Sequence, residues 1–493
     1  MEPKKEHVVV SSGSRIVRNT VFSSLSELSL ILNFLFFMMA PKYLGGADYG
    51  KLASALAFVG LFTLFVVFGF SYSITKFIVK NRSQTGRYVG NALYLQFGLA
   101  LVCFLLCQGT AWLLRWKYPP QVQLVIAIVY AAEALKCFNL TLRASCKALG
   151  EFYIDTIAVN AERILLVVLG GYLLIGGKGL ITVAAVLPIS RLVSFLILIR
   201  FMGRLGHPVF SRPDPALCRE LARRSFVYVV QSAIWRVYDN IDVFLLSLFR
   251  SFEEVGWYSL ARRILEGLCL VPNILTEAVY PELTSRHLVS RNLVATLFSK
   301  SLKYMLAVAF VVAFGTVVIS SDFIRSLFGE SFRNTSGVLV LLGIAVVPSF
   351  VRYLFGTTLI AVNLQKMEIL VAAGRSGFNA AANLIAIPLW GFMGAGVAVL
   401  FTEWIFLVPY LVILARQRLI VKGHWKFAAK PFLAVAMLVP PILALSSVDS
   451  FFVLGGAIVL YALLLFGFRI FSEEEIKVFK EYLMRRLKIA RPS

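Results

Sequence analysis

The side chains in this sequence that could do chemistry are ionisable residues set within long apolar stretches. An arginine guanidinium stays charged and grips a phosphate through two parallel hydrogen bonds, which a lysine ammonium does not do. Arginines in apolar stretches therefore form a candidate site for an anionic headgroup. For each of them the alternative is a structural role as the partner of a buried acid. The five candidates are Arg191, Arg236, Arg262, Arg263 and Arg352.

Acidic and amide side chains in the same stretches form a second candidate set. A carboxyl group deep in an apolar stretch can carry a proton or bind Na⁺. The competing interpretation is that these acids only neutralise the arginines. The candidates for ion coupling are Asp239, Asp242, Asn379, Asn383 and Glu403.

Spacing offers a local partner to only some of these charges. Residues three or four apart on a helix can form an ion pair, whereas the adjacent Glu162 and Arg163 cannot face each other. We expect the charges without a local partner to meet in one solvated cavity. The pairs with suitable spacing are Glu133 with Lys136, Arg236 with Asp239, and Arg262 with Glu266. Those without a local partner include Arg191, Asp242, Arg263, Arg352 and Glu403.

Motifs for catalysis or metal binding are not found. The four histidines are scattered and the six cysteines form no C-x-x-C pair, so neither a zinc site nor a disulfide is expected. We expect the cysteines to be small packing residues. The sequence predicts no catalytic residue, no enzyme activity and no cofactor other than Na⁺ or H⁺ as a coupling ion.

The elements that hold these residues are those of a polytopic membrane protein. The 493-residue chain is 59% apolar and 15% charged, with a mean hydropathy of +0.81. Soluble domains are about 45–50% apolar and about 25% charged, so a soluble enzyme, a disordered chain and a secreted disulfide scaffold are excluded. At about 20 residues a span, the sequence predicts about fourteen membrane helices. They fall at 19–40, 52–75, 90–114, 122–144, 157–176, 180–200, 226–249, 257–280, 304–327, 337–361, 368–389, 394–414, 431–447 and 452–469.

Basic residues are unevenly distributed between alternate connections. One set of connections holds about fourfold more lysine and arginine than the other, which is typical of cytoplasmic loops. We therefore predict a multi-pass protein of the plasma or inner membrane with both termini in the cytoplasm. The net charge of +23 then reflects these loops, and no nucleic-acid partner is expected. The longest outer connections, such as 41–51 and 328–336, are too short to form a catalytic domain.

An internal repeat groups the spans. Turn sequences following span 1 and preceding spans 5 and 6 have counterparts near spans 7, 11 and 12 at similar offsets. Parallel repeats of this kind are typical of transporters. Two amphipathic segments are expected at the cytoplasmic lipid surface, the first opening with a helix start at Asp214. The second could equally be a solvated tail. The predicted division is an N-lobe at 1–202, a linker at 203–225, a C-lobe at 226–416, two further spans at 430–470 and a tail at 471–493.

Several short motifs resemble those of one membrane protein family. The turn Tyr43–Gly50 resembles an LG-x-x-x-YG motif, and three later segments match the same family's spans 7 and 8. The family is the Wzx-type lipid-linked oligosaccharide flippases, or polysaccharide biosynthesis proteins, of the multidrug/oligosaccharidyl-lipid/polysaccharide exporter superfamily. The resemblance covers most of the first twelve spans. The three later segments are Arg236–Asp242, Val255–Ala261 and Tyr280–Leu283.

The resemblance implies an all-α fold of two six-helix bundles in a V around a central cavity. It implies a cargo consisting of an oligosaccharide on a polyprenyl diphosphate, whose diphosphate is bound by the cavity arginines. In related flippases an acid in span 7 joins spans 11 and 12 in a sodium site. The counterparts here are Asp239 or Asp242, together with Asn379, Asn383 and Thr402 or Glu403.

The function expected from these observations is translocation of a lipid-linked oligosaccharide from the cytoplasmic to the outer leaflet for cell-surface polysaccharide synthesis. We expect alternating access, coupling to a cation, and a monomer surrounded by membrane lipids. Glycosyltransferases and a polymerase of the same pathway are the expected protein partners. The first alternative is a cation-coupled multidrug exporter of the same superfamily. A membrane glycosyltransferase or polymerase is less favoured, because its catalytic residues usually lie on a large outer loop.

Overall fold

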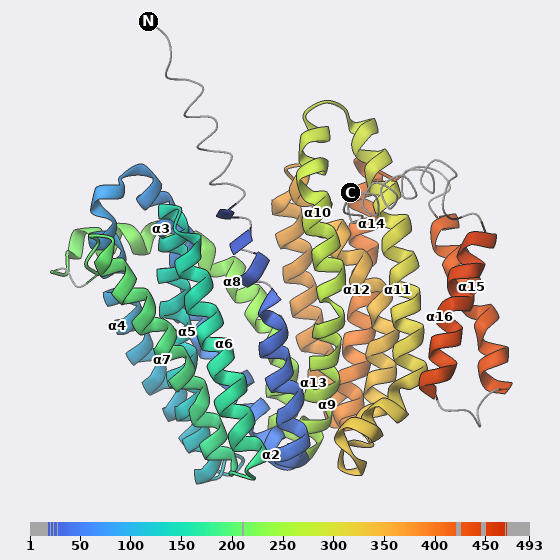
Figure 1. The fold of residues 1–493 in the computed structure, drawn as a ribbon, viewed down its shortest axis with the longest axis horizontal. Coiled ribbons are helices and arrows are strands. Elements are labelled where there is room, and N and C mark those ends of the chain that lie inside the picture. Colours follow the sequence, from blue (N-terminus) through green and yellow to red (C-terminus); the bar gives the residue numbers. More distant parts are fainter. Residues whose placement is uncertain are drawn as a thin grey trace, which may run out of the picture. The chain divides into compact units, whose positions relative to one another are not determined.

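The computed structural model describes residues 18–19, 21–22, 24–26, 28–209, 212–420, 425–444, 450–468 and 470. Within these ranges the regular structure is helical (Figure 1). The first helices are α2 (Leu30–Val67), α3 (Phe70–Lys80), η1 (Arg82–Gln84), α4 (Thr85–Leu113), α5 (Pro120–Leu149), α6 (Phe152–Ile175), α7 (Leu180–Arg204) and α8 (Pro215–Phe249). They are followed by α9 (Phe252–Leu268), α10 (Leu270–His287), α11 (Arg291–Phe328), η2 (Glu330–Phe332), α12 (Thr335–Ala361), α13 (Gln365–Ile405), α14 (Leu407–Arg416), α15 (Trp425–Ala444) and α16 (Ser450–Gly467).

The predicted all-α membrane fold is confirmed. Nine helical stretches of the described chain are long and apolar enough to cross a membrane. Two of them, Ser24–Lys80 and Gln365–Arg416, each contain two predicted spans, so the nine account for eleven of the fourteen. The other three predicted spans lie in α8, in α9 with α10, and in α15. Charged residues occur within α8, α9 and α10, and the apolar part of α15 is shorter, at Ala429–Ile442.

Glycines mark the turns between spans that are otherwise continuous. Gly45 in α2 (φ 75°) and Gly391 in α13 (φ 61°) adopt left-handed backbone conformations, which glycine reaches without a Cβ penalty. These two positions coincide with the predicted outer connections between spans 1 and 2 and between spans 11 and 12. A turn of so few residues keeps the helical pattern on both sides, which explains the unusual length of α2 and α13.

The described chain forms two compact units. Unit 1 comprises residues 1–263 and 376–395, and unit 2 comprises 264–375 and 396–493. These boundaries differ from the predicted lobes. Helix α8 and most of α9, assigned to the C-lobe, belong to unit 1, because α8 packs along α2 and α3. The central part of α13 also belongs to unit 1. The predicted tail at 471–493 lies outside the described residues.

Unit 1 contains α2 to α8, with a core that gathers residues from most of these helices. Phe70, Leu142 and Leu198 are fully buried there, and Leu221 at the start of α8 joins them. The amphipathic segment predicted at 213–225 thus packs Leu217 and Leu221 against this core. Asp214 caps α8 as expected, accepting hydrogen bonds from the amides of Ala216 and Leu217.

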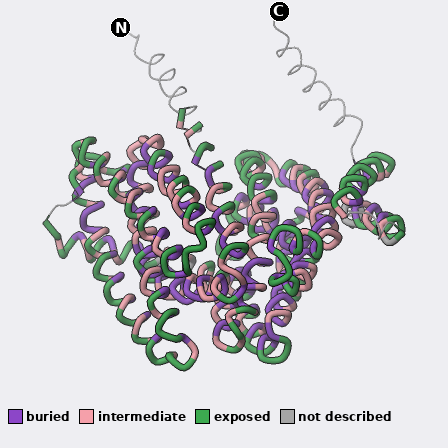
Figure 2. Tube along the Cα trace, turned by 60° about the horizontal axis from the view of Figure 1, so that its bottom comes forward, coloured by how far each residue is buried: buried purple, intermediate pink, exposed green. Residues whose placement is uncertain are grey.

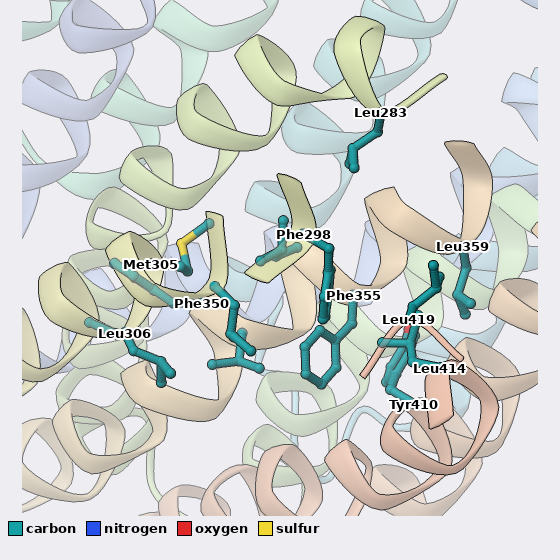
Figure 3. Close-up of a cluster of buried hydrophobic side chains, with 14 of the residues drawn as sticks. Leu283, Phe298, Met305, Leu306, Phe350, Phe355, Leu359, Tyr410, Leu414 and Leu419 are labelled. Atoms are coloured by element: carbon teal, nitrogen blue, oxygen red, sulfur yellow. The ribbon is translucent and has the colours of Figure 1, made fainter. Parts of the chain in front are cut away.

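Unit 2 is built around α11 and α12. Figure 3 shows its core, in which Phe298 of α11 lies near Phe355 of α12, and Tyr410 of α14 closes the cluster. Helices α15 and α16 form a smaller cluster against α11, where the Tyr461 hydroxyl donates to the Ala307 carbonyl at 2.8 Å. The last two helices are thus attached to unit 2 by both packing and a hydrogen bond.

Many helices bury one side and expose apolar side chains on the other. Figure 2 shows buried and exposed residues alternating along single helices. On α4, Phe97, Leu101 and Leu105 are 64%, 53% and 62% exposed. Soluble monomers rarely expose large apolar patches, so these faces are suited to lipid. The described part of the chain is accordingly that of a multi-pass membrane protein.

Candidate functional site

The largest charged group within unit 1 surrounds Glu133, which is buried in α5. Arg191 of α7 places Nη1 2.9 Å from Glu133 Oε1, and Arg236 of α8 places Nη1 3.9 Å from Oε2. Lys136, one turn along α5, lies 3.3 Å from Oε2, as the spacing predicted. Glu162 of α6 completes the set, 3.8 Å from Arg191 Nε. We call these five residues the Glu133 cluster.

The Glu133 cluster carries three cations and two carboxylates, an excess of one positive charge. Arg236 also donates to the Thr63 hydroxyl at 3.2 Å, so α2 contributes to the cluster. The side chain of Lys136 is 45% exposed whereas those of Arg191 and Glu133 are 11% and 8% exposed. The cluster therefore extends from a buried centre to an accessible edge. An anion entering at that edge would contact Lys136 first and then the less exposed arginines.

Arg163, the neighbour of Glu162, points to a different partner. Its Nη1 donates to the Ser26 carbonyl at 2.5 Å and to the Ser29 hydroxyl at 2.6 Å. The prediction that Glu162 and Arg163 find separate partners on other helices is confirmed. Adjacent residues on a helix point about 100° apart, which is why one faces α7 and the other faces the start of α2.

A second charged group in unit 1 surrounds Asp242, which is fully buried in α8. Its Oδ2 accepts a hydrogen bond from the Tyr258 hydroxyl at 2.5 Å and contacts Nη1 of Arg262 on α9. Asp239 lies one turn earlier, 3.9 Å from Arg262 Nη2, with a side chain that is 61% exposed. Of the two acids proposed for span 7, Asp242 is buried and contacts a cation and a hydroxyl, while Asp239 is largely exposed.

Arg263 follows Arg262 but faces an aromatic ring. Its guanidinium carbon lies 4.4 Å from the ring centroid of Phe37 in α2, a cation–π distance. This contact desolvates one face of the guanidinium and positions Arg263 beside the first span. The structure therefore separates two arginines that the sequence placed in one candidate set.

A third charged group lies in unit 2. Glu403 of α13 is 2% exposed and accepts from two arginines, with Arg352 Nε 2.9 Å from Oε2 and Arg375 Nη1 2.7 Å from Oε1. Arg352 comes from α12, and its charge was expected to face a solvated cavity. In this structure Arg352 and Glu403 are both buried and paired with each other. We call Glu403, Arg352 and Arg375 the Glu403 cluster.

The two candidate asparagines lie one turn apart on α13, within unit 1. Asn383 Nδ2 donates to the Asn379 carbonyl at 2.8 Å and to its side-chain oxygen at 3.1 Å. Both side chains are buried. The ten candidate residues thus fall into separate groups: Arg352 and Glu403 lie in unit 2, and Arg191, Arg236, Asp239, Asp242, Arg262, Arg263, Asn379 and Asn383 lie in unit 1.

Sequence reasoning missed several buried polar groups. Arg375 was not among the candidate arginines, yet it is the largest fully buried side chain in the described residues. Asp155 of α6 is 1% exposed and pairs with both Arg143 and Lys147. The i,i+4 spacing of Arg143 and Lys147 on α5 was the available signal, because it places two cations on one face.

The turn at Gly391 in α13 is held by charged residues from the α8–α9 connection. Arg250 donates from Nε to the Ile387 carbonyl at 3.2 Å and from Nη2 to the Pro388 carbonyl at 2.7 Å. Glu254 accepts from the Phe392 amide at 3.2 Å. A broken helix leaves backbone groups without partners, and these two side chains satisfy three of them. We call Arg250, Glu254 and the turn they hold the Gly391 clamp.

Lys117, in the connection before α5, supports the Gly391 clamp. Its Nζ donates to the Arg250 carbonyl at 2.6 Å. Burial lowers the pKa of the Lys117 ammonium, and the nearby Glu254 carboxylate acts in the opposite direction. Hydrogen bonds therefore join the connection before α5, the connection between α8 and α9, the first turn of α9 and the middle of α13 within unit 1.

Comparisons with known proteins identify relatives of this chain by sequence. Residues 16–287, more than half of the chain, match the family described as "Polysaccharide biosynthesis protein". The probable low-salt glycan biosynthesis flippase Agl15 of Haloferax volcanii is 23% identical over 377 residues, covering 74% of this chain and 76% of the relative. The probable flippase AglR of the same organism is 28% identical over 170 residues, covering 33% of this chain and 35% of AglR.

Solved structures with the same fold are membrane transporters. The lipid II flippase MurJ in an inward closed conformation superposes with a TM-score of 0.72 at 16% identity, covering 91% of this chain and 99% of MurJ. An inward-facing multidrug resistance transporter of the MATE family superposes with a TM-score of 0.59 at 14% identity, covering 81% of this chain and 98% of that structure. The chain belongs to the polysaccharide biosynthesis protein family and is a multi-pass membrane protein with the fold of MOP-superfamily transporters.

Proposed function

We propose that this protein is a flippase that moves a polyprenyl-diphosphate-linked oligosaccharide from the cytoplasmic to the outer leaflet by alternating access. The observation that carries the proposal is the Glu133 cluster. Arg191 and Arg236 come from different helices and converge on one buried carboxylate, with a third cation at an accessible edge. The cluster has an excess of positive charge among apolar helices, and a bound diphosphate would neutralise that excess.

The diphosphate would bind by replacing one acceptor with another. The Arg191 guanidinium contacts the Glu133 carboxylate at 2.9 Å, whereas the Arg236 guanidinium is 3.9 Å from that carboxylate and interacts with it more weakly. A phosphate can accept two parallel hydrogen bonds from a guanidinium. It would therefore bind Arg236 more strongly than Glu133 does across 3.9 Å. We propose that Lys136 and Arg236 meet the headgroup first and that Arg191 binds it after displacement from Glu133.

A charged site of this kind addresses the main free-energy barrier of the reaction. A diphosphate and a glycan are strongly hydrated, and moving them through hydrocarbon without partners costs many kcal/mol. Fixed cations within the protein replace part of that hydration. The apolar carrier lipid needs no such compensation, so we propose that it stays in the bilayer, against exposed apolar faces such as that of α4.

The relatives support this substrate class. Agl15 and AglR are named as flippases, Agl15 in low-salt glycan biosynthesis, and MurJ is a flippase for lipid II. The family name places the matched segment in polysaccharide biosynthesis. We therefore propose a role in surface glycan synthesis, acting on a lipid-linked product of glycosyltransferases and supplying a polymerase or ligase.

Coupling and topology are part of the same proposal. We propose that both termini are cytoplasmic, from the excess of Lys and Arg in alternate connections, and that the protein acts as a monomer in the cell membrane. A cation drives transport, with Na⁺ or H⁺ as the candidates. Asp239 is the predicted ion-coupling acid that remains exposed, near Arg262, and Asn379 and Asn383 are the proposed amide contributors.

The decisive experiment is complementation of a deletion strain in the native host. Plasmids would carry the wild type, Arg191→Ala, Arg236→Ala or the control Arg333→Ala, whose side chain is 78% exposed. We expect surface glycan to fall by at least about tenfold in the first two variants, equal to ~1.4 kcal/mol of lost binding. Lipid-linked glycan should accumulate in the membrane, and protein abundance should match the control.

Two results would contradict the proposal. Full surface glycan in a deletion strain lacking any complementing plasmid would show that the protein is not needed for export. Normal export by both arginine variants at control abundance would remove the Glu133 cluster from the substrate site. If cationic drugs accumulate in the deletion strain while glycan export is normal, the multidrug exporter is the better assignment.

A further inference from the structure

The described residues contain five buried carboxylates, and four of them have a cation within ion-pair distance. Glu133 has Lys136, Arg191 and Arg236, and Glu403 has Arg352 and Arg375. Asp155 has Arg143 and Lys147, and Asp242 has Arg262. The fifth is Glu368 of α13, 6% exposed, with no lysine or arginine nitrogen that close in the described part of the chain.

The groups around Glu368 come from α12, α13 and α14. Its Oε1 accepts a hydrogen bond from the Tyr410 hydroxyl of α14 at 3.4 Å, a long contact for an O–H donor. On the α12 side the backbone at Gly356 approaches, where an added Cβ would stand 3.6 Å from Oε1. The charged groups that face Glu368 are Arg352 of α12 and Arg375 of α13, and both contact Glu403 rather than Glu368.

An ionised carboxylate in this position would be costly. Removing it from water carries a desolvation penalty that a paired cation offsets in the other four cases. At Glu368 the direct contact is one long hydrogen bond from a hydroxyl, and the two arginines that face it are engaged by Glu403. A bound proton is therefore the simplest way to remove the penalty. When Glu368 is protonated, its carboxyl O–H can donate to the Tyr410 oxygen. When Glu368 is ionised, the Tyr410 hydroxyl donates to the carboxylate, so both forms keep one hydrogen bond.

Glu368 also has a short route to water. It stands in the first turn of α13, directly after the exposed residues Gln365, Lys366 and Met367. The amides at a helix N-terminus favour a negative charge nearby. Burial thus favours the protonated form of Glu368, and the helix terminus favours the ionised form. These opposite effects reduce the free-energy difference between the two forms.

We propose that Glu368 is a proton-binding carboxyl and that proton exchange at this residue rearranges the Glu403 cluster during transport. Loss of the proton to water leaves a carboxylate that competes with Glu403 for Arg352 and Arg375. Uptake of a proton returns both arginines to Glu403. This inference rests on the proposed flippase function only in its second half, because proton binding by Glu368 stands without any substrate.

Proton binding can be measured on the purified full-length protein without transport. Infrared difference spectra recorded across a pH series show a carbonyl band for each protonated buried carboxyl. We expect a pH-dependent band in the wild type that is lost in Glu368→Gln and shifted in frequency in Tyr410→Phe. The matched control Glu330→Gln, at a 59% exposed side chain, should leave the band unchanged. A wild-type spectrum without this band, or a band unaffected by both variants, would overturn the assignment.

The coupling is tested in proteoliposomes containing lipid-linked oligosaccharide extracted from the host membrane. An imposed pH gradient should change the rate of flipping by the wild type and leave Glu368→Gln unaffected at equal protein content. Flipping that ignores the gradient in the wild type would refute coupling at Glu368 while leaving the flippase intact. Absence of flipping, with the infrared band present, would refute the proposed function while leaving the proton site intact.

Discussion

Arg375 and Glu403 both belong to α13, 28 positions apart, yet Arg375 Nη1 lies 2.7 Å from Glu403 Oε1. An unbroken helix would hold residues at this separation about 42 Å apart, at 1.5 Å per residue. The turn at Gly391 folds the helix back and makes the contact possible. One glycine with a positive φ therefore allows a second arginine, besides Arg352, to reach this buried carboxylate.

Removing one arginine from the Glu403 cluster should destabilise the protein. Arg375→Ala removes one of the two arginines that contact Glu403, and breaking a buried ion pair costs about 3–5 kcal/mol. We expect a lower midpoint in equilibrium unfolding of the purified protein in mixed detergent and SDS micelles. Arg333→Ala, at an exposed side chain, should remain within ~0.5 kcal/mol of the wild type. Equal stability of the two variants would mean that the buried pair contributes nothing measurable.

Two glycines in unit 1 allow a close approach of α2 and α9. A Cβ added to Gly50 would stand 1.6 Å from the Phe252 carbonyl oxygen, and one added to Gly256 would stand 2.2 Å from the Gly46 oxygen. Gly50→Ala should therefore force the two backbones apart, at a cost of at least about 1–3 kcal/mol. The readout is the melting temperature in detergent.

Gly98→Ala is the matched control for Gly50→Ala, because a Cβ at Gly98 meets nothing within 4 Å. Gly98 lies within α4, where alanine is favoured over glycine by roughly 0.5–1 kcal/mol. We expect the control to melt at or slightly above the wild-type temperature. A Gly50→Ala protein as stable as Gly98→Ala would contradict the packing of α2 against α9.

The Gly391 clamp should control local opening of the turn in α13. Glu254→Ala removes the acceptor of the Phe392 amide, and an unmade hydrogen bond of a buried group costs about 1–3 kcal/mol. Hydrogen exchange at Phe392 should speed up by roughly 5- to 150-fold, following from that range. Exchange in α6, far along the chain, serves as the internal reference. Unchanged protection at Phe392 would argue that Glu254 does not hold the turn.

Stability should depend on pH through Asp214. The Arg87 guanidinium, 2.5 Å from its carboxylate, lowers the pKa of Asp214, and the Leu217 amide acts in the same direction. Because the folded-state pKa lies below the unfolded value, this contribution is fully present above the unfolded pKa and is lost as pH falls through the folded pKa. Asp214→Asn should melt below the wild type at neutral pH, and the difference should shrink in acid. A difference that is constant at every pH would exclude the carboxylate as its source.

Hydropathy and charge were sufficient to predict the helices. Long apolar segments report directly on membrane spans because a spanning backbone must satisfy its own hydrogen bonds. The turns at Gly45 and Gly391 were found for the same reason, since glycines interrupt the apolar runs there. The helix start at Asp214 was also predicted, because N-capping depends only on neighbouring residues.

Most ion-pair partners could not be predicted from the spacing of residues along one helix. Glu133 with Lys136 was found from an i,i+3 interval, but Arg191 lies 58 positions from Glu133 along the chain and is closer to it in space. Arg375 was not a candidate from the sequence, and the structure buries it against Glu403. Ion pairs between distant residues depend on which helices pack side by side, and the pattern of apolar residues does not predict this packing.

The sequence by itself determined that this chain is an all-helical membrane protein with arginines and acids inside its spans, because hydropathy and charge are properties of single residues and short windows. The tertiary structure decided which charges neutralise each other and where α8 packs. Among the described residues, it left Glu368 as the buried carboxylate with no lysine or arginine nitrogen within ion-pair distance. Those outcomes are determined by helix–helix packing, in which side chains far apart in sequence come within a few ångströms and compete for the same partners.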